Sequence, residues 1–264
     1  MNIIHNLFDR FLKTGVYDKL HKIAFGDLEY RMYRLNQFLQ EAADHHRKIF
    51  PQFKNKYAGR EIVIVACGPT AAAYQPIPGA VHIAINRAIR MKEIEFDYLF
   101  AGDGGPGSRD FINELNAYPV EKCVKFYAKF PPRIADSGVG ISESDVIKAK
   151  ALRYYVEDFQ ELRGFNPDFA FDLANSAMAR RETTVFQALQ FALWTNPKRI
   201  YLVGCDCTST GHFYNKTEQN TLTPSHLLEH YRDFKRFAET YYPDTEIISI
   251  NPVGLKGMFK DLPM

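Results

Sequence analysis

The sequence lacks a strong charge of either sign. Its 264 residues include 33 Lys and Arg and 31 Asp and Glu, which leaves a net charge of +2 at pH 7. The basic residues are spread along the chain rather than gathered in one segment. Proteins that grip nucleic acid usually concentrate positive charge in a patch or a stripe. We therefore expect no nucleic-acid partner.

Cysteines and long hydrophobic runs are also scarce. The chain has four cysteines, Cys67, Cys123, Cys205 and Cys207, each in or beside an apolar run. This pattern does not suggest a disulfide framework and is typical of a reducing compartment. A zinc site is not expected either, because the Cys-x-Cys pair lacks a convincing second pair of ligands. No segment resembles a signal peptide or a membrane span, so we expect a cytoplasmic protein, either free or peripheral to the inner face of the membrane.

Apolar residues are plentiful, at 46% of the chain, which is enough for one sizeable core. The first 57 residues read as helical, because apolar residues such as Leu28, Met32 and Leu35 recur at helical spacing. We expect residues 1–58 to form a helical arm that packs on the main domain or on a second subunit of a homo-oligomer. Contact with anionic lipid is an alternative, but the mixed charges of the arm favour the first interpretation.

Short apolar runs alternate with helical patterns over residues 59–264. Such alternation predicts crossover connections and hence an α/β fold, a Rossmann-like and mostly parallel sheet flanked by helices. Segments 102–110 and 130–144 are rich in Pro, Gly and Ser, so we expect loops there and a small lid over about residues 130–180. The expected strands are Ile62–Ala66, Val81–Ile85, Tyr98–Gly102, Cys123–Ala128, Leu152–Val156, Arg199–Gly204 and Glu246–Ile250, and the expected helices are Thr183–Thr195 and Ser225–Tyr241.

The first candidate binding motif follows the first strand, at Cys67, Gly68, Pro69 and Thr70. A glycine permits close approach of the backbone, and a helix after the turn would present free N–H groups to a phosphate. The motif is neither the Gly-x-Gly-x-x-Gly fingerprint nor a P-loop. Taken alone, it is equally typical of a tight connection after a strand.

Two polar residues come directly after the next two strands. Asn86 could bond a base or a ribose, or else cap a helix. Asp103 would point into the crevice at the carboxyl edge of a parallel sheet. There it could serve a ribose, a metal or an acceptor, or it could be a simple turn residue.

The densest group of polar residues follows the strand that ends at Gly204. Asp206 is followed by the hydroxyls of Thr208 and Ser209 and then by His212 and Tyr214. Hydroxyl groups and a phenol can hold a phosphate without a metal.

His226 opens the helix predicted at residue 225, and His230 lies one turn further along it. A histidine is well suited to remove a hydroxyl proton near neutral pH. Metal ligation by both histidines, or a plain surface position, remain alternatives.

Taken together, these motifs resemble the bacterial sialyltransferases of glycosyltransferase family 42 and the related domain of motility accessory factors and 6-hydroxymethylpterin diphosphokinases. The resemblance covers roughly residues 61–252. It rests on Cys67-Gly68-Pro69-Thr70, Asn86, Lys198–Asp206, Tyr214, His226 and Asn251-Pro252.

The resemblance implies inverting transfer of sialic acid from CMP-sialic acid to a surface-glycan acceptor, with no required cofactor or metal. His226 would be the general base and Tyr214 would bind the departing phosphate. Gly68, Thr70 and Asn86 would bind the nucleotide.

Three features depart from that family. The Arg and Ser that precede the following helix in the family have no clean match around Arg180, Arg181 and Glu182. Cys67 stands where the family usually has Asn, and the second phosphate-binding tyrosine falls near Thr208, so Thr208, Ser209 or His212 would assist the leaving group instead. We therefore expect a sialyltransferase-like glycosyltransferase of lipopolysaccharide or capsule biosynthesis. The alternatives are an ATP- and magnesium-dependent pterin diphosphokinase-like enzyme, with Asp103 and Asp206 as metal ligands, and a non-catalytic nucleotide-binding scaffold.

Overall fold

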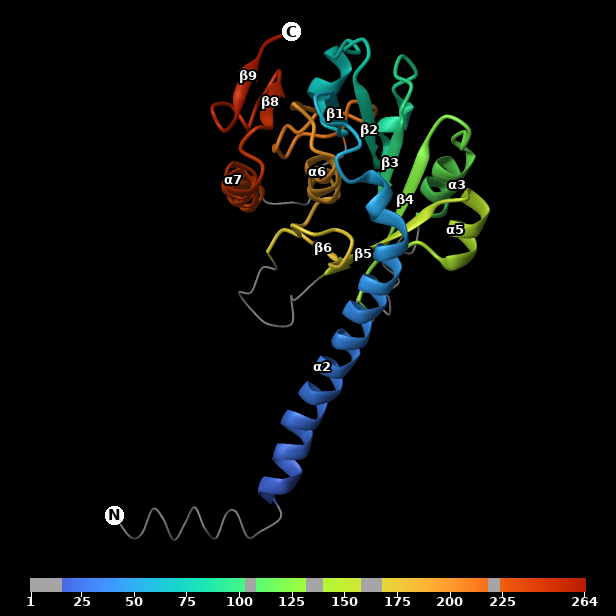
Figure 1. Ribbon diagram of the computed structural model, residues 1–264, viewed down its shortest axis with the longest axis vertical. Helices are drawn as coiled ribbons and strands as arrows, with labels where there is room; N and C mark the ends of the chain where they lie inside the picture. The colour runs from blue at the N-terminus through green and yellow to red at the C-terminus, as the bar shows by residue number, and fades with distance from the viewer. Residues whose placement is uncertain (1–15, 103–107, 132–139, 158–167, 218–223) are drawn as a thin grey trace, which may run out of the picture. The chain divides into compact units, whose positions relative to one another are not determined.

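The computed structural model describes residues 16–102, 108–131, 140–157, 168–217 and 224–264. The chain divides into two compact units, Met1–Glu41 and Ala42–Met264. A single helix, α2 (Val16–Ile49), begins in the first unit and ends in the second (Figure 1). It confirms the helical prediction over its own length, whereas residues 1–15 lie outside the described part of the chain. No helix in the described segments has both the length and the hydropathy needed to span a bilayer. The boundary of the arm near residue 58 stays a prediction.

The second unit is built on one sheet of nine described strands. Every neighbouring pair in it is parallel, and the order is β6-β5-β4-β3-β2-β1-β7-β8-β9. The α/β prediction of a Rossmann-like parallel sheet is therefore confirmed. The strands are β1 (Glu61–Val65), β2 (Val81–Ile85), β3 (Tyr98–Ala101), β4 (Val124–Lys129), β5 (Leu152–Glu157), β6 (Met178–Ala179), β7 (Arg199–Val203), β8 (Glu246–Ile250) and β9 (Lys260–Leu262).

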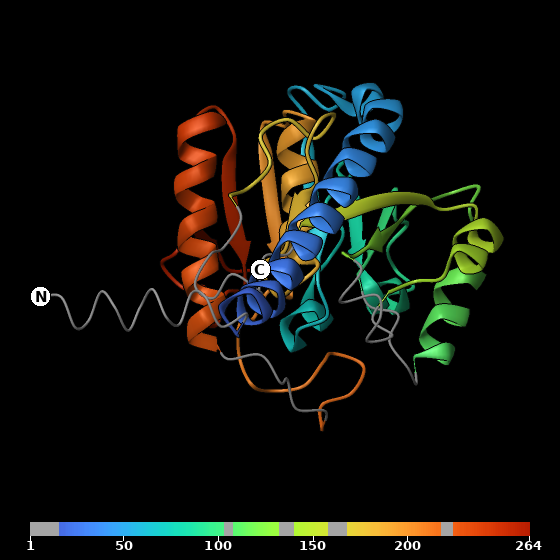
Figure 2. The same ribbon diagram turned by 90° about the horizontal axis from the view of Figure 1, so that it is seen from below.

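Helices cover both faces of this sheet, and successive residues of β1 point to opposite faces. Ile62 and Ile64 pack in the same cluster as α6 (Val185–Trp194) and α7 (Pro224–Tyr241). Val63 and Val65 pack in the cluster that contains α3 (Arg109–Ala117) and α5 (Glu143–Ala149). Figure 2 shows α6 and α7 side by side. A strand buried on both faces must be continuously apolar, which is why β1 was recognisable in the sequence.

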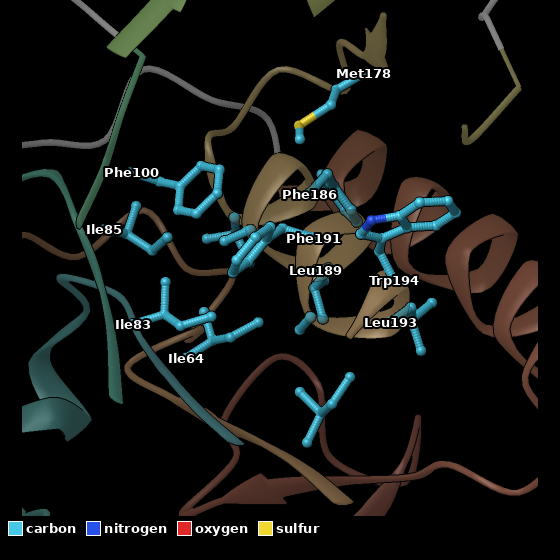
Figure 3. Close-up of a cluster of buried hydrophobic side chains, with 14 of the residues drawn as sticks. Ile64, Ile83, Ile85, Phe100, Met178, Phe186, Leu189, Phe191, Leu193 and Trp194 are labelled. Carbon is cyan, nitrogen blue, oxygen red and sulfur yellow. The ribbon is translucent and has the colours of Figure 1, made fainter. Parts of the chain in front are cut away.

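Helix α6 is the centre of the larger cluster, because all ten of its residues are buried. Figure 3 shows side chains of β1, β2 and β3 directed toward this helix. The Phe191 ring lies 5.1 to 5.3 Å from those of Tyr98, Phe126 and Phe100. Packing of these rings fixes α6 against the sheet and so fixes where its first turn lies.

Three local expectations need correction. The turn at Gly68 leads not into an α-helix but into a short 3-10 helix, η2 (Pro69–Ala73), because Pro76 and Pro78 lie just beyond it and cannot supply the N–H groups of a longer helix. Helices α3 and α5 begin at Arg109 and Glu143, inside segments expected to be irregular. Strands β6 and β9 were not expected at all. The lid over about residues 130–180 stays a prediction.

The order of the strands creates one special position. The chain lays β2 to β6 outward on one side of β1 and then returns to place β7 on its other side. The crevice beyond the carboxyl ends of β1 and β7 is thus a topological switch point, the usual ligand site of open α/β sheets.

Candidate functional site

A cavity of about 500 Å³ lies at this switch point. Its walls come from the carboxyl ends of β1, β2 and β7, the first residues of α6 and α7, and the start of α3. The described residues that line it are Ala66, Cys67, Gly68, Pro69, Ile85, Asn86, Arg87, Ser108, Phe111, Glu182, Thr183, Thr184, Val185, Gly204, Cys205, Asp206, Cys207, Thr208, Thr210, Gly211, His212, Tyr214, Leu227 and Tyr231. This size suits a small organic ligand.

The turns after β1 and β7 touch each other at the floor of the cavity. Asp206 accepts a hydrogen bond from the Thr70 N–H at 2.9 Å and a second one from the Thr70 hydroxyl. A Cβ atom on Gly68 would lie 2.5 Å from the Gly204 carbonyl and from Asp206 Oδ2, so only glycine fits there. The two turns are therefore fixed relative to each other. Thr70 stabilises this arrangement through its hydrogen bonds to Asp206, but it does not line the cavity.

Three non-glycine residues that line the cavity have left-handed backbone conformations, which such residues rarely adopt. The φ angles are 51° at Asn86, 63° at Glu182 and 49° at Cys207. Such conformations cost free energy and tend to gather at functional sites. Asn86 also ties two strand ends together, because its Oδ1 accepts a hydrogen bond from the Gly102 N–H at 3.3 Å.

The loop after β7 supplies aromatic and hydroxyl groups to one wall. The imidazole of His212 stacks on the ring of Tyr214, with centroids 5.1 Å apart, and the Arg90 guanidinium lies 4.6 Å from the same ring. The hydroxyls of Thr208 and Thr210 are 2.7 Å apart and hydrogen-bonded. This wall can offer several hydroxyl donors to an anionic ligand.

Three thiols also line the cavity. Burial raises the pKa of Cys67 and of Cys207 to about 12, and it raises the pKa of Cys205 as well. The reactive form of cysteine is the thiolate. The three side chains are therefore neutral near pH 7 and act as small apolar groups rather than as nucleophiles.

Most of the residues singled out in the sequence meet at this cavity. Those that line it are Cys67, Gly68, Pro69, Asn86, Gly204, Asp206, Thr208, His212 and Tyr214, whereas Thr70, Ser209 and His226 do not line it. His226 is exposed in the first turn of α7, next to Leu227, which lines the cavity. Asp103 lies outside the described residues.

Other lining residues were not anticipated. Arg87 follows Asn86 directly, Ser108 comes from the segment 102–110 that was expected to be a loop, and Phe111 comes directly after that segment. Glu182 and Thr184 precede α6. The predicted start of a helix near residue 183, at the carboxyl edge of a parallel sheet, was a usable signal for this last pair.

The sequence matches no protein-family model and no curated protein. A solved structure of the sialyltransferase CstII from Campylobacter jejuni, in complex with a substrate analogue, CMP-3FNeuAc, is similar to part of this chain. The identity is 12%, the TM-score is 0.41, and the match covers 77% of this chain and 86% of that chain. A likeness of this degree assigns neither a family nor a substrate to the chain.

Proposed function

We propose that the chain is a glycosyltransferase that moves a sugar, sialic acid or a similar one, from a CMP-activated donor to a surface-glycan acceptor. One observation carries the proposal: nine residues singled out from the sequence as site residues line a single cavity at the switch point of the sheet. The donor nucleotide would occupy this cavity. The glycan would belong to lipopolysaccharide or capsule, and the reaction would need no cofactor or metal.

The proposed chemistry is a single displacement with inversion. His226 takes the proton of the acceptor hydroxyl while that oxygen bonds to the anomeric carbon of the sugar. At the same time the bond from this carbon to the phosphate oxygen breaks, and CMP leaves with the electron pair. Tyr214 and Thr208 donate hydrogen bonds to the leaving phosphate, with His212 beside them.

The position of His226 suits an acceptor that arrives from solvent. Its side chain is exposed, yet its neighbour Leu227 is part of the cavity wall. A base at the rim would meet a large acceptor without forcing it into the cavity.

The test combines nucleotide binding with one substitution. Melting temperatures would be measured with CMP, CDP, UDP, GDP and ATP, each with and without magnesium, since a ligand at about a hundred times its Kd adds about 2.7 kcal/mol of stability. We expect CMP to stabilise most, without magnesium. His226→Ala should then lower kcat for transfer from a CMP-sugar by about two to four orders of magnitude and leave the Kd of CMP unchanged.

Glu229→Ala is the matched control, because Glu229 is exposed on the same helix. It should transfer sugar at the wild-type rate. Full activity of His226→Ala would refute the assignment of the base. Stabilisation by ATP with magnesium alone would favour a diphosphokinase-like enzyme, and CMP binding without any transfer would favour a scaffold.

A further inference from the structure

Arg87 is the one lysine or arginine among the described residues that line the cavity. It belongs to the 3-10 helix η3 (Asn86–Arg90), directly after the carboxyl end of β2. Two acidic residues, Glu182 and Asp206, also line the cavity. The Asp206 carboxylate accepts two hydrogen bonds from Thr70 and is engaged between the turns after β1 and β7.

The guanidinium of Arg87 is held in place by its surroundings. It lies 4.7 Å from the centre of the Phe111 ring, which allows a cation–π contact. Its Nε is 3.6 Å from Glu114 Oε2, an ion-pair distance that is longer than a hydrogen bond. These contacts orient the side chain without using all of its five donors.

Glu114 does not neutralise Arg87 fully, because Arg90 takes both of its oxygens. Arg90 Nε donates to Oε1 at 2.6 Å and Arg90 Nη2 donates to Oε2 at 2.8 Å. These hydrogen bonds hold the pKa of the Glu114 carboxyl below its usual value. The single carboxylate of Glu114 therefore pairs with two guanidinium groups, and it leaves one of their two positive charges uncompensated.

The Nε of Arg87 is also a buried donor without a hydrogen bond to any described residue. A buried donor that stays unpaired costs free energy, so the contacts within the protein leave this guanidinium incompletely satisfied. Arginine matches the oxygens of a phosphate better than lysine does, because its planar fork can make two parallel hydrogen bonds.

We propose that Arg87 is the phosphate anchor of this cavity and binds the phosphate of the nucleotide donor. This assignment rests on the proposed function and makes it more specific. It adds Arg87 to Tyr214 and Thr208, the side chains that donate hydrogen bonds to the leaving phosphate, and all three line the same cavity.

The test compares CMP with cytidine, which has the same base and ribose but no phosphate. Kd values would be measured by isothermal titration calorimetry for the wild type, Arg87→Met and Arg87→Lys. We expect Arg87→Met to raise the Kd of CMP about 10- to 100-fold and to leave that of cytidine unchanged. Arg87→Lys should fall between the two, because it keeps the charge and loses the fork.

Arg60→Met is the matched control. Arg60 precedes β1, at the opposite edge of the sheet, and donates to the Gly79 carbonyl at 3.0 Å. The Arg60→Met variant loses the same charge as Arg87→Met, and it should bind CMP with the wild-type Kd. An equal loss of CMP affinity in Arg60→Met, or an unchanged CMP affinity in Arg87→Met, would overturn the assignment.

Two further measurements keep the proposal decidable. If neither variant of Arg87 folds, the wild type alone suffices. The ratio of the Kd of cytidine to the Kd of CMP should fall as the salt concentration is raised, and a ratio that is independent of salt would refute the anchor.

Binding of inorganic pyrophosphate distinguishes the phosphate anchor from the proposed CMP donor. Arg87-dependent binding of pyrophosphate without any binding of CMP would support the anchor and refute the CMP donor.

Discussion

His46 makes the stability of the second unit dependent on pH in a way that can be measured. Its imidazole is fully buried near the end of α2. Nδ1 lies 2.8 Å from the Ser176 carbonyl and 3.1 Å from the Leu173 carbonyl, and Nε2 accepts a hydrogen bond from the Tyr155 N–H at 2.9 Å. Carbonyls only accept and an amide N–H only donates, so Nδ1 carries the hydrogen and the ring is neutral.

Protonation of this ring would place a second hydrogen on Nε2, opposite the N–H of Tyr155. Burial is the main reason why the pKa of His46 falls from 6.5 to about 4. Between these values the unfolded chain binds a proton that the folded chain does not bind. The stability that the neutral ring supplies is therefore complete above pH 6.5 and is lost as the pH falls toward 4. At about 1.4 kcal/mol per pH unit, the loss is about 3 kcal/mol.

Other groups titrate over the same range of pH. The informative quantity is therefore the difference in unfolding free energy between the wild type and a variant that lacks only this imidazole. Urea unfolding would be measured from pH 4 to pH 8 for the wild type and for His46→Gln, whose amide is uncharged at every pH. The advantage of the wild type should shrink by about 3 kcal/mol from pH ~7.5 to pH ~4.

Curves of unfolding free energy that run parallel for the two proteins would refute this reasoning. They would mean that His46 binds its proton equally well in the folded and the unfolded chain. The slope of the urea dependence serves as the control, since it must stay the same if the two native states bury the same surface.

Two further predictions concern a strand end and the cavity floor. Burial, with Asp168 nearby, raises the pKa of Glu157 to about 7, so its protonated form adds stability at low pH that is lost as the pH rises through 7. Glu157→Gln should therefore be more stable than the wild type at pH 8 and not at pH 4, in the same urea assay. Gly68→Ala would force a methyl group to within 2.5 Å of the Gly204 carbonyl, so we expect a lower melting temperature and weaker CMP binding by calorimetry, and wild-type values for both would contradict the close contact of the two turns.

The order and type of most elements could be predicted from the sequence. Strands β1 and β2 are buried along nearly their whole length, and a strand of this kind must be an apolar run. The two shortest strands escaped notice for the opposite reason. β6 has two residues and β9 has three exposed ones, so neither is long enough or apolar enough to stand out.

The candidate site was predictable only in part. Asn86, directly after β2, and Tyr214, in the loop after β7, could be grouped because the carboxyl ends of parallel strands share one edge. The pairing of Thr70 with Asp206 joins positions 136 residues apart, and no local pattern announces it. Nor does the sequence reveal that Glu114 accepts hydrogen bonds from Arg90 and lies only at ion-pair distance from Arg87.

By itself the sequence determined the alternation of strands and helices, since burial imposes a period on the side chains that any packed element must show. It also determined which polar residues stand at strand ends. Only the tertiary structure decided which of these side chains face one cavity and which are already engaged with each other. Hydrogen bonds and ion pairs depend on distances of a few ångströms between distant parts of the chain, and those distances exist only after the helices have packed on the sheet.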